Sequence, residues 1–330
     1  MSNKKIIAIV AGGYSSEMQV SLKSAEGICS FLDADRYKAY IVLIDREKWL
    51  VKIAENNLVP VDKNDFGFTD TAGQKVKFDY AYITIHGTPG ENGLLQGYFE
   101  MLQLPYSGCD VLTSALTFSK YVCNRYLNGY GVKTAASVLL RSNDYDAESL
   151  VTALGLPIFV KPNDGGSSCG TTKVRRAEDL SAAIDTAFAE GREVIVESFM
   201  RGTEVTCGCY RSGNGDLIVF PVTEVVSKNE FFDFDAKYNP QSVEEITPAR
   251  ISPELTAAVQ HTTRQIYEWI HAKGIIRVDY ILSSAGEIRM LEVNTTPGMT
   301  VTSFIPQQVR AAGLNMTDVL TDIIEHGNSR

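Results

Sequence analysis

The sequence predicts an α/β protein, and its 330 residues are enough for two or three domains with a sizeable core. Two stretches carry this prediction. An apolar strand at residues 5–10 leads through a glycine turn into a helix at about 16–31, which is how a doubly wound unit begins. Residues 277–300 contain two apolar strands joined by a turn at 283–286, which is the pattern of a β-hairpin.

The elements between these stretches are predicted from apolar runs that turn-forming residues separate. Further strands are expected at residues 40–44, 80–85, 138–140, 158–161, 194–197, 204–210 and 217–226. Helices are expected at residues 94–104, 117–129, 146–154, 178–190, 253–272, 306–312 and 316–325. No internal repeat or low-complexity tract interrupts them.

Composition and charge exclude several classes of protein. Hydrophobic residues make up 44% of the chain and charged residues 22%, which is an ordinary soluble globular profile. The formal charge of −9 argues against a nucleic-acid surface, which needs a basic face. No apolar run approaches the roughly 20 residues of a membrane span, and the chain opens with a strand rather than a signal peptide. We therefore expect no nucleic-acid and no membrane partner.

Six cysteines are scattered through the sequence: Cys29, Cys109, Cys123, Cys169, Cys207 and Cys209. The pair Cys207 and Cys209 lies inside an apolar strand pattern, and no second pair follows at zinc-binding spacing. We therefore expect reduced, mostly structural cysteines and a cytoplasmic protein.

Polar side chains with oxygen ligands converge in the hairpin. Strand pairing would bring Asp279 close to Glu292 and Asn294, and alternation along a strand puts Glu292 and Asn294 on one face. Oxygen ligands of this kind suit Mg²⁺, which shares its shell with substrate phosphates. Arg277 would lie on the same face and suits charge that develops on oxygen. The alternative is a surface ion pair, but acids in strands this apolar need a metal or a partner.

The first half of the chain offers candidate substrate residues. Glu17 lies in the first turns of the first helix, where it could bind a substrate or simply complement the helix dipole. His86 and Glu91 belong to a polar, glycine-rich loop after a predicted strand, which is where open α/β sheets bind ligands. They could touch substrate there or only hold the loop. The predicted helix at 117–129 carries Lys120.

Three segments in the middle of the chain suit a nucleotide. Lys161 begins a Gly/Ser-rich turn that is rich in backbone N–H groups for phosphates, although a plain hairpin loop explains the same residues. Glu197 and Glu204 flank an apolar hinge that could hold a purine, or they are solvated acids of core strands. Residues 231–238 are aromatic and charged and predict an active-site flap, with Lys237 and Tyr238 at its working end.

Eight stretches taken together resemble the ATP-grasp ligases and, among them, the D-alanine–D-alanine ligase family. In chain order they are AGGYSSEMQVSL, HGTPGENGLLQG, LPYSGCDVLTSALTFSK, LPIFVKPNDGGSSCG, VIVESFMRGTEVT, FFDFDAKY, RVDY and LEVNTTPGMT. They cover nearly the whole chain in the family's order, which makes the resemblance specific. It implies a three-domain ATP-grasp fold: a doubly wound, Rossmann-like domain at 1–113 for the first substrate, and two α+β domains at 114–205 and 206–330 that hold ATP between their sheets.

The resemblance also implies the nucleotide and metal ligands. The ATP phosphates would contact three lysines, Lys120, Lys161 and Lys237. The adenosine would lie by Glu197, Phe199, Met200 and Glu204. Two Mg²⁺ ions, for which Mn²⁺ could substitute, would bind Asp279, Glu292 and Asn294.

The remaining residues that match the family's pattern surround the two amino-acid substrates. Glu17 matches the residue that receives the ammonium of the first D-alanine, and His86 and Glu91 match the loop near it. Ser167 and Tyr238 match the hydrogen-bonding partners that tie the phosphate loop, which is the Gly/Ser-rich turn that begins at Lys161, and the flap to Glu17. The oxyanion stabilisers are matched by Arg277 and the backbone of Gly298, and the hydroxyl for the second carboxylate by Ser303.

The reaction implied is ATP-dependent ligation of two D-alanines to D-alanyl-D-alanine through D-alanyl phosphate, with release of ADP and phosphate, for peptidoglycan precursors. We expect a homodimer. Phe304 stands where relatives often have Leu or Met in the second-substrate pocket, which leaves D-serine as a possible second substrate. A related D-alanine–D-lactate ligase is the other alternative, but ligases of that kind lack the flap tyrosine that is Tyr238 here. Another ATP-grasp carboxylate–amine ligase should lack the set Glu17, Ser167 and Tyr238. An ATP-binding regulatory protein should lack Arg277 or a metal ligand. This sequence keeps both sets.

Overall fold

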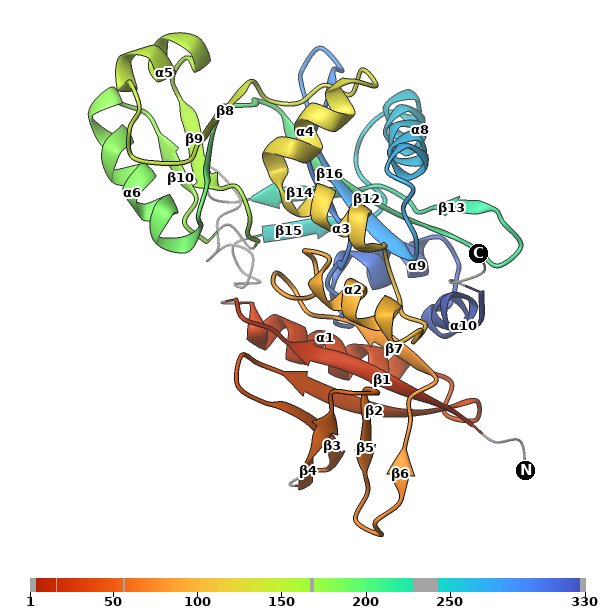
Figure 1. Ribbon diagram of the computed structural model, residues 1–330. Coiled ribbons are helices and arrows are strands. Elements are labelled where there is room, and N and C mark those ends of the chain that lie inside the picture. Colours follow the sequence, from red (N-terminus) through yellow and green to blue (C-terminus); the bar gives the residue numbers. More distant parts are fainter. Residues whose placement is uncertain (1–3, 16, 56, 167–168, 228–242, 327–330) are drawn as a thin grey trace.

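The computed structural model describes residues 4–15, 17–55, 57–166, 169–227 and 243–326. It contains three β-sheets that follow one another along the chain, each with helices packed on it (Figure 1). The predicted α/β class is confirmed. Within the described residues, no helix is both long enough and apolar enough to cross a bilayer. All six cysteines are free thiols.

The N-terminal sheet has the strand order β6-β5-β4-β3-β2-β1-β7. Its strands are β1 (Lys5–Gly12), β2 (Tyr37–Ile44), β3 (Trp49–Ala54), β4 (Asn57–Asp62), β5 (Gly67–Thr69), β6 (Lys75–Val76) and β7 (Tyr80–Ile83). Only β2, β1 and β7 are parallel. The doubly wound prediction therefore describes this part, and β3 to β6 extend it as antiparallel strands that were not predicted.

Alternate residues of β1 pack against different helices. Ile7 and Ile9 face a cluster with α1 (Met18–Phe31) and α10 (Met316–His326), whereas Ala8 and Val10 face a cluster with α2 (Leu94–Met101). This period of two is expected for a strand that is buried on both faces. The C-terminal helix α10 thus completes the core of the N-terminal sheet.

The central sheet is antiparallel, with the order β10-β9-β11-β8. Its strands are β8 (Ser137–Leu140), β9 (Ile158–Pro162), β10 (Thr172–Val174) and β11 (Val194–Ser198). The helices α5 (Ala147–Leu154) and α6 (Leu180–Glu190), the latter preceded by the 3-10 turn η1 (Ala177–Asp179), cover one face through Ile158, Val160, Val194 and Val196. Alternation therefore places Lys161 and Glu197 on the other face.

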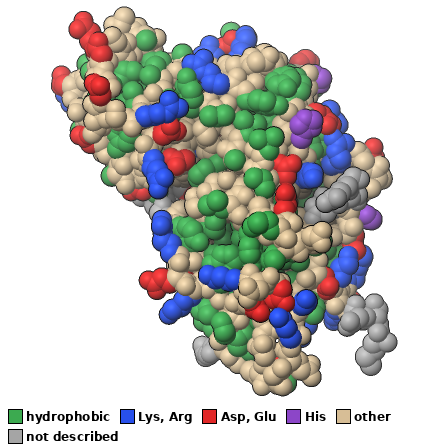
Figure 2. Space-filling model, viewed as in Figure 1, with side chains coloured by type: hydrophobic (Ala, Val, Ile, Leu, Met, Phe, Trp, Pro, Cys, Tyr) green, Lys and Arg blue, Asp and Glu red, His purple; other side chains and the backbone are tan. Residues whose placement is uncertain are grey.

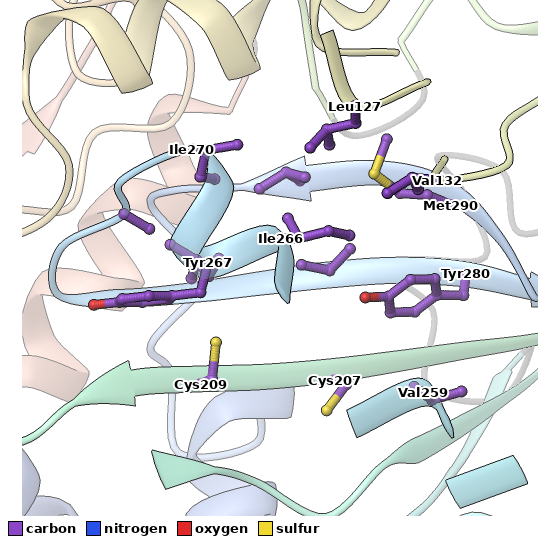
Figure 3. Packing of buried hydrophobic residues seen from close by; sticks show 14 of the residues in the cluster. Leu127, Val132, Cys207, Cys209, Val259, Ile266, Tyr267, Ile270, Tyr280 and Met290 are labelled. Atoms are coloured by element: carbon purple, nitrogen blue, oxygen red, sulfur yellow. The ribbon is translucent and has the colours of Figure 1, made fainter. Parts of the chain in front are cut away.

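The C-terminal sheet has the order β15-β14-β12-β16-β17, with β13 also paired to β12. Its strands are β12 (Thr203–Arg211), β13 (Leu217–Val219), β14 (Thr223–Ser227), β15 (Val243–Ile246), β16 (Ile275–Leu282) and β17 (Ile288–Asn294). The helix α8 (Pro253–Trp269) packs on one face, where Tyr267 lies near Cys209 and Tyr280 points into the same core (Figure 3). The helix α9 (Phe304–Ala311) contacts β12.

Two predicted elements are each divided in the structure. The helix expected at 117–129 is α3 (Val111–Phe118) followed by α4 (Lys120–Asn128), because Ser119 is extended and its side chain caps α4. The strand expected at 217–226 is β13 followed by β14. Pro221 lies in the break, where it has no N–H to offer a ladder.

Candidate active site

The hairpin predicted from the sequence is formed, with Asp279 opposite Glu292 and Arg277 opposite Asn294 in the β16/β17 ladder. Asp279 is 7% exposed and accepts four hydrogen bonds. Arg277 donates two, from Nε to Oδ1 at 2.9 Å and from Nη2 to Oδ2 at 2.8 Å. Asn294 Nδ2 donates to Oδ2 at 3.1 Å, and Thr206 Oγ1 donates to Oδ1 at 2.6 Å.

Arg277 is held between an acid and an aromatic ring. Its guanidinium lies 5.3 Å from the centre of the Phe304 ring. Burial alone would lower the pKa of Arg277, but the charges of Asp279 and Glu292 and the hydrogen bonds to Asp279 raise it above its usual value. The side chain therefore stays charged inside the site.

The loop after β17 brings Ser303 next to Gly298. A Cβ on Gly298 would lie 3.2 Å from Ser303 Oγ, and that oxygen accepts a hydrogen bond from Thr300 N at 3.0 Å. The loop is fixed against α1, because Met299 N donates to Ser24 Oγ at 3.3 Å and a Cβ on Gly27 would lie only 2.2 Å from Met299 O. Ser303 and Phe304 begin α9 at the mouth of this loop.

The central sheet contributes a buried ion pair. Lys161 Nζ lies 2.6 Å from Glu197 Oε2, and both residues are buried. Asn124 Nδ2 also donates to Glu197 at 3.2 Å. Two of the residues proposed for ATP are therefore brought together. Phe199 and Met200 follow directly after β11, where the Phe199 ring lies 5.9 Å from Phe159 and Met200 is buried. Glu204 is half-buried on β12.

Lys120 joins α4 to the Gly/Ser-rich loop. Its Nζ donates to the carbonyl of Gly165, and its backbone N–H donates to Asn163 O at 3.1 Å. Burial lowers the pKa of Lys120, whereas the charge of Glu292 opposes that shift. The lysine is thus close enough to Glu292 for the two charges to interact, which links the phosphate loop to the hairpin.

The N-terminal part of the site surrounds Glu17, which is 7% exposed and precedes α1. A Cβ on Gly166 would lie 2.5 Å from Glu17 Oε2, so the phosphate loop passes directly over this carboxylate. Burial lowers the pKa of His86, with the charges of Glu17 and Arg277 acting in opposite directions. Nε2 of His86 has no hydrogen-bond partner among the described residues.

Glu91 completes this part of the site. Its Oε2 accepts a hydrogen bond from Gly87 N at 2.6 Å. Burial raises the pKa of Glu91 to about 8, and the negative charges of Glu17 and Glu292 act in the same direction. An acid that is protonated at neutral pH can donate as well as accept a hydrogen bond.

Most of the predicted site residues therefore come together, from the hairpin through Lys120 to Glu17. Three of them, Ser167, Lys237 and Tyr238, and the flap predicted at 231–238 lie outside the described residues. Three further contacts in the site were not predicted from the sequence. Thr206 donates a hydrogen bond to Asp279, and Asn124 donates one to Glu197. Asn163 in the phosphate loop accepts one from Tyr121 N of α4. A threonine in an apolar strand and an asparagine in a helix give no signal of such contacts.

Family models match most of the chain. A model described as D-ala D-ala ligase N-terminus matches residues 6–109, and one described as D-ala D-ala ligase C-terminus matches residues 127–325. A D-alanine–D-alanine ligase of Parabacteroides distasonis is 62% identical over 98% of this chain and 97% of its own length. That of Phocaeicola vulgatus is 54% identical over 98% of this chain and 99% of its own length.

Solved structures give the same fold. The VanG D-Ala:D-Ser ligase of Enterococcus faecalis has a TM-score of 0.86 at 33% identity, over 98% of this chain and 99% of its own. The D-alanyl-alanine synthetase A of Vibrio cholerae has a TM-score of 0.89 at 26% identity, over 99% of both chains.

Proposed function

This chain belongs to the D-alanine–D-alanine ligase family of ATP-grasp enzymes, and we propose on that basis that it joins two D-alanines into D-alanyl-D-alanine. ATP is consumed, a D-alanyl phosphate forms, and ADP and phosphate are released. The observation that carries the proposal is the continuous arrangement of charged groups from Asp279 and Arg277 through Lys120 to Glu17. A reaction that must hold an amino acid and a triphosphate side by side needs such an arrangement.

The nucleotide would lie on the face of the central sheet that carries Lys161 and Glu197. Lys120, Lys161 and Lys237 would neutralise its phosphates, and Glu197, Phe199, Met200 and Glu204 would surround the adenosine. The ion pair of Lys161 with Glu197 supports this assignment, because it holds a cation on the face opposite α5 and α6.

The hairpin fits divalent cations by the chemistry of its donors. Asp279, Glu292 and Asn294 offer only oxygens to a hard ion, on one face of paired strands. Two Mg²⁺ ions, or Mn²⁺ in their place, would be held there and would supply charge neutralisation for the phosphates of ATP. Asp279 would exchange part of its bonding to Arg277 and Asn294 for this role.

The protein's own groups then account for the steps on the amino acids. Glu17 would bind the ammonium of the first D-alanine, with His86 and Glu91 beside it, and Ser167 and Tyr238 would tie the loop and flap to Glu17. The first carboxylate attacks the γ-phosphate to give the acylphosphate. The amine of the second D-alanine, once deprotonated, attacks the carbonyl carbon of this acylphosphate, and phosphate leaves. Arg277 and the backbone of Gly298 would stabilise the oxyanion, while Ser303 holds the second carboxylate. Closure of the predicted flap would exclude water, which otherwise hydrolyses the acylphosphate.

The biological setting is proposed on the same basis. We propose a cytoplasmic enzyme that supplies peptidoglycan precursors and works as a homodimer. Apolar side chains are exposed on α2 and α3, among them Leu94, Met101 and Leu112, and α3 has no charged residue. Figure 2 shows hydrophobic side chains gathered over the middle of the molecule, where Figure 1 places these helices. Exposed apolar side chains on these helices suit pairing of two chains that each carry −9, because strongly charged faces would repel each other.

The division into domains at 1–113, 114–205 and 206–330 is likewise a proposal. It is supported by the central sheet, whose apolar cluster contains only residues of that sheet and of the segments packed on it. Other features cross the proposed boundaries: one cluster joins β1 of the first sheet to Tyr210 and Ile275 of the third. The strand β12 runs across the 205/206 boundary, and Cys123 and Leu127 of α4 pack in the core of the C-terminal sheet.

Product analysis tests the proposed function. The enzyme is given ATP, Mg²⁺ and D-alanine with an equal amount of D-lactate or D-serine. We expect D-alanyl-D-alanine as the main product at neutral pH, because a polar, acidic site around Glu17 favours an amine over a neutral hydroxyl. Phe304 leaves D-serine as a minor second substrate. A D-lactate or D-serine product in excess would overturn the substrate assignment, and no phosphate release with any amino acid would overturn the ligase assignment.

A further inference from the structure

Three side chains donate the four hydrogen bonds to Asp279, and they differ in whether the proposed function gives them a second role. Arg277 and Asn294 each have a further role in the proposed function, at the oxyanion and at the metal. Thr206 has none: among the described residues its hydroxyl contacts only the carboxylate. When Arg277 turns to the substrate and Asn294 presents its oxygen to a cation, two of the three donor residues are drawn away from Asp279.

Thr206 is built to stay in place. It is 2% exposed and lies directly opposite Asp279 in the β12/β16 ladder, so the two side chains share one face of the sheet. Its branched side chain has few rotamers. Its backbone carbonyl accepts a hydrogen bond at 3.0 Å from Gln308 Nε2, a side chain of α9 that is fully buried. Gln308 also accepts a hydrogen bond from Gly208 N of β12 and donates one to Thr223 Oγ1 of β14. It therefore links β12 to β14, the neighbouring strand on the side away from β16.

We propose that Thr206 is the positioning residue for Asp279, an inference that rests on the proposed function. Its hydroxyl holds Oδ1 at 2.6 Å and so directs Oδ2 toward the cation when the other donors leave. Hydrogen bonds to a ligating carboxylate orient it and commonly change metal affinity by about 10- to 100-fold when they are removed. Through Gln308, the same residue ties the carboxylate to α9, the helix that begins with Ser303 and Phe304.

The test measures cation binding rather than turnover. The dissociation constant for Mn²⁺ is determined by electron paramagnetic resonance of the free ion, with a non-hydrolysable ATP analogue bound. Thr206→Val removes the hydroxyl at nearly constant shape, and Thr206→Ser keeps it. The matched control is Thr263→Val. Thr263 Oγ1 on α8 forms a hydrogen bond of 2.8 Å with the hydroxyl of Tyr280, which follows Asp279 on β16 and points to the opposite face of the sheet.

We expect Thr206→Val to weaken Mn²⁺ binding by about 10-fold or more, and Thr206→Ser to stay near the wild type. Thr263→Val should lower the melting temperature without changing Mn²⁺ affinity. If Thr206→Val does not fold, the pair Thr206→Ser and Thr206→Ala gives the same comparison. Unchanged affinity in the variants without the hydroxyl, or equal weakening in Thr263→Val, overturns the inference alone. A wild type that does not bind Mn²⁺ at all overturns the metal site of the proposed function with it.

Discussion

The two halves of the candidate active site are built differently. The hairpin half, with Arg277, Asp279 and Asn294, lies on two neighbouring strands, and its hydrogen bonds follow from their register. The other half gathers Glu17, Glu91, Lys120 and the phosphate loop from separate segments, and glycine at position 166 allows their close approach. The hairpin half therefore depends on which side chains it carries, whereas the other half depends on how close its backbones come.

The largest effect is expected from removing charge in the hairpin half. Glu292→Gln and Asp279→Asn should reduce ATP-dependent phosphate release by at least about 10²-fold, because electrostatic stabilisation in the site is lost while the shape is kept. The circular dichroism spectra should stay close to that of the wild type. Asp279→Asn should also lower the melting temperature, because its amide cannot accept all four hydrogen bonds and leaves Arg277 without its counter-charge. Near-wild-type release by either variant at ordinary Mg²⁺ would mean that the site is assigned wrongly.

A methyl group added to the phosphate loop tests whether this half of the site depends on close backbone approach. Gly166→Ala would place a Cβ 2.5 Å from Glu17 Oε2, so we expect kcat/KM for D-alanine to fall by about 10-fold or more. The neighbouring Gly165→Ala is the matched control, because its Cβ would come no closer than 3.7 Å to Pro162. Equal kinetics in the two variants would show that the loop does not need its close approach to Glu17.

The smallest expected effect concerns Glu91 and pH. Its pKa is about 8 in the folded protein against 4.5 for the free side chain, so its stabilising contribution is complete below about pH 4.5 and is lost as the pH rises to about 8. Between pH 5 and 8 the wild type should lose about 1–2 kcal/mol of stability relative to Glu91→Gln, after allowance for solvent near a half-buried group. Urea unfolding at several pH values measures this.

Glu287→Gln provides the control for that series. Hydrogen bonds from Lys133 and Arg289 lower the pKa of Glu287, so its contribution is already complete above about pH 5. The free energy of unfolding of this variant should therefore change with pH as that of the wild type does between pH 5 and 8. A wild type that runs parallel to Glu91→Gln as well would place Glu91 in a more polar environment than its burial indicates.

The same contrast explains what could be predicted from the sequence. Alternation in β16 and β17 is a local pattern, so the pairing of Asp279 with Glu292 followed from the residues alone. The nearness of Glu17 to Gly166 depends on segments about 150 residues apart, and only family resemblance indicated it. The strands β3 and β4 were missed because each has a single buried residue, and β5 and β6 because they have only three and two residues. The break at Ser119 was missed because serine, although it is favoured at helix caps, also occurs inside helices, so one serine does not mark a boundary.

The packing of α10 on β1 has a consequence for synthesis of the chain. Leu320 and Ile323 of α10 fill the cluster that contains Ile7 and Ile9, and Glu325 binds Lys5 and Tyr37. These partners leave the ribosome roughly 230 residues after β7 ends, which takes tens of seconds at about 5–20 residues per second. Until then α1 alone covers this face of the first sheet, and the surface that α10 fills stays exposed. Chains that lack α10 should therefore expose apolar surface of this cluster, and α10 completes the core of the first sheet.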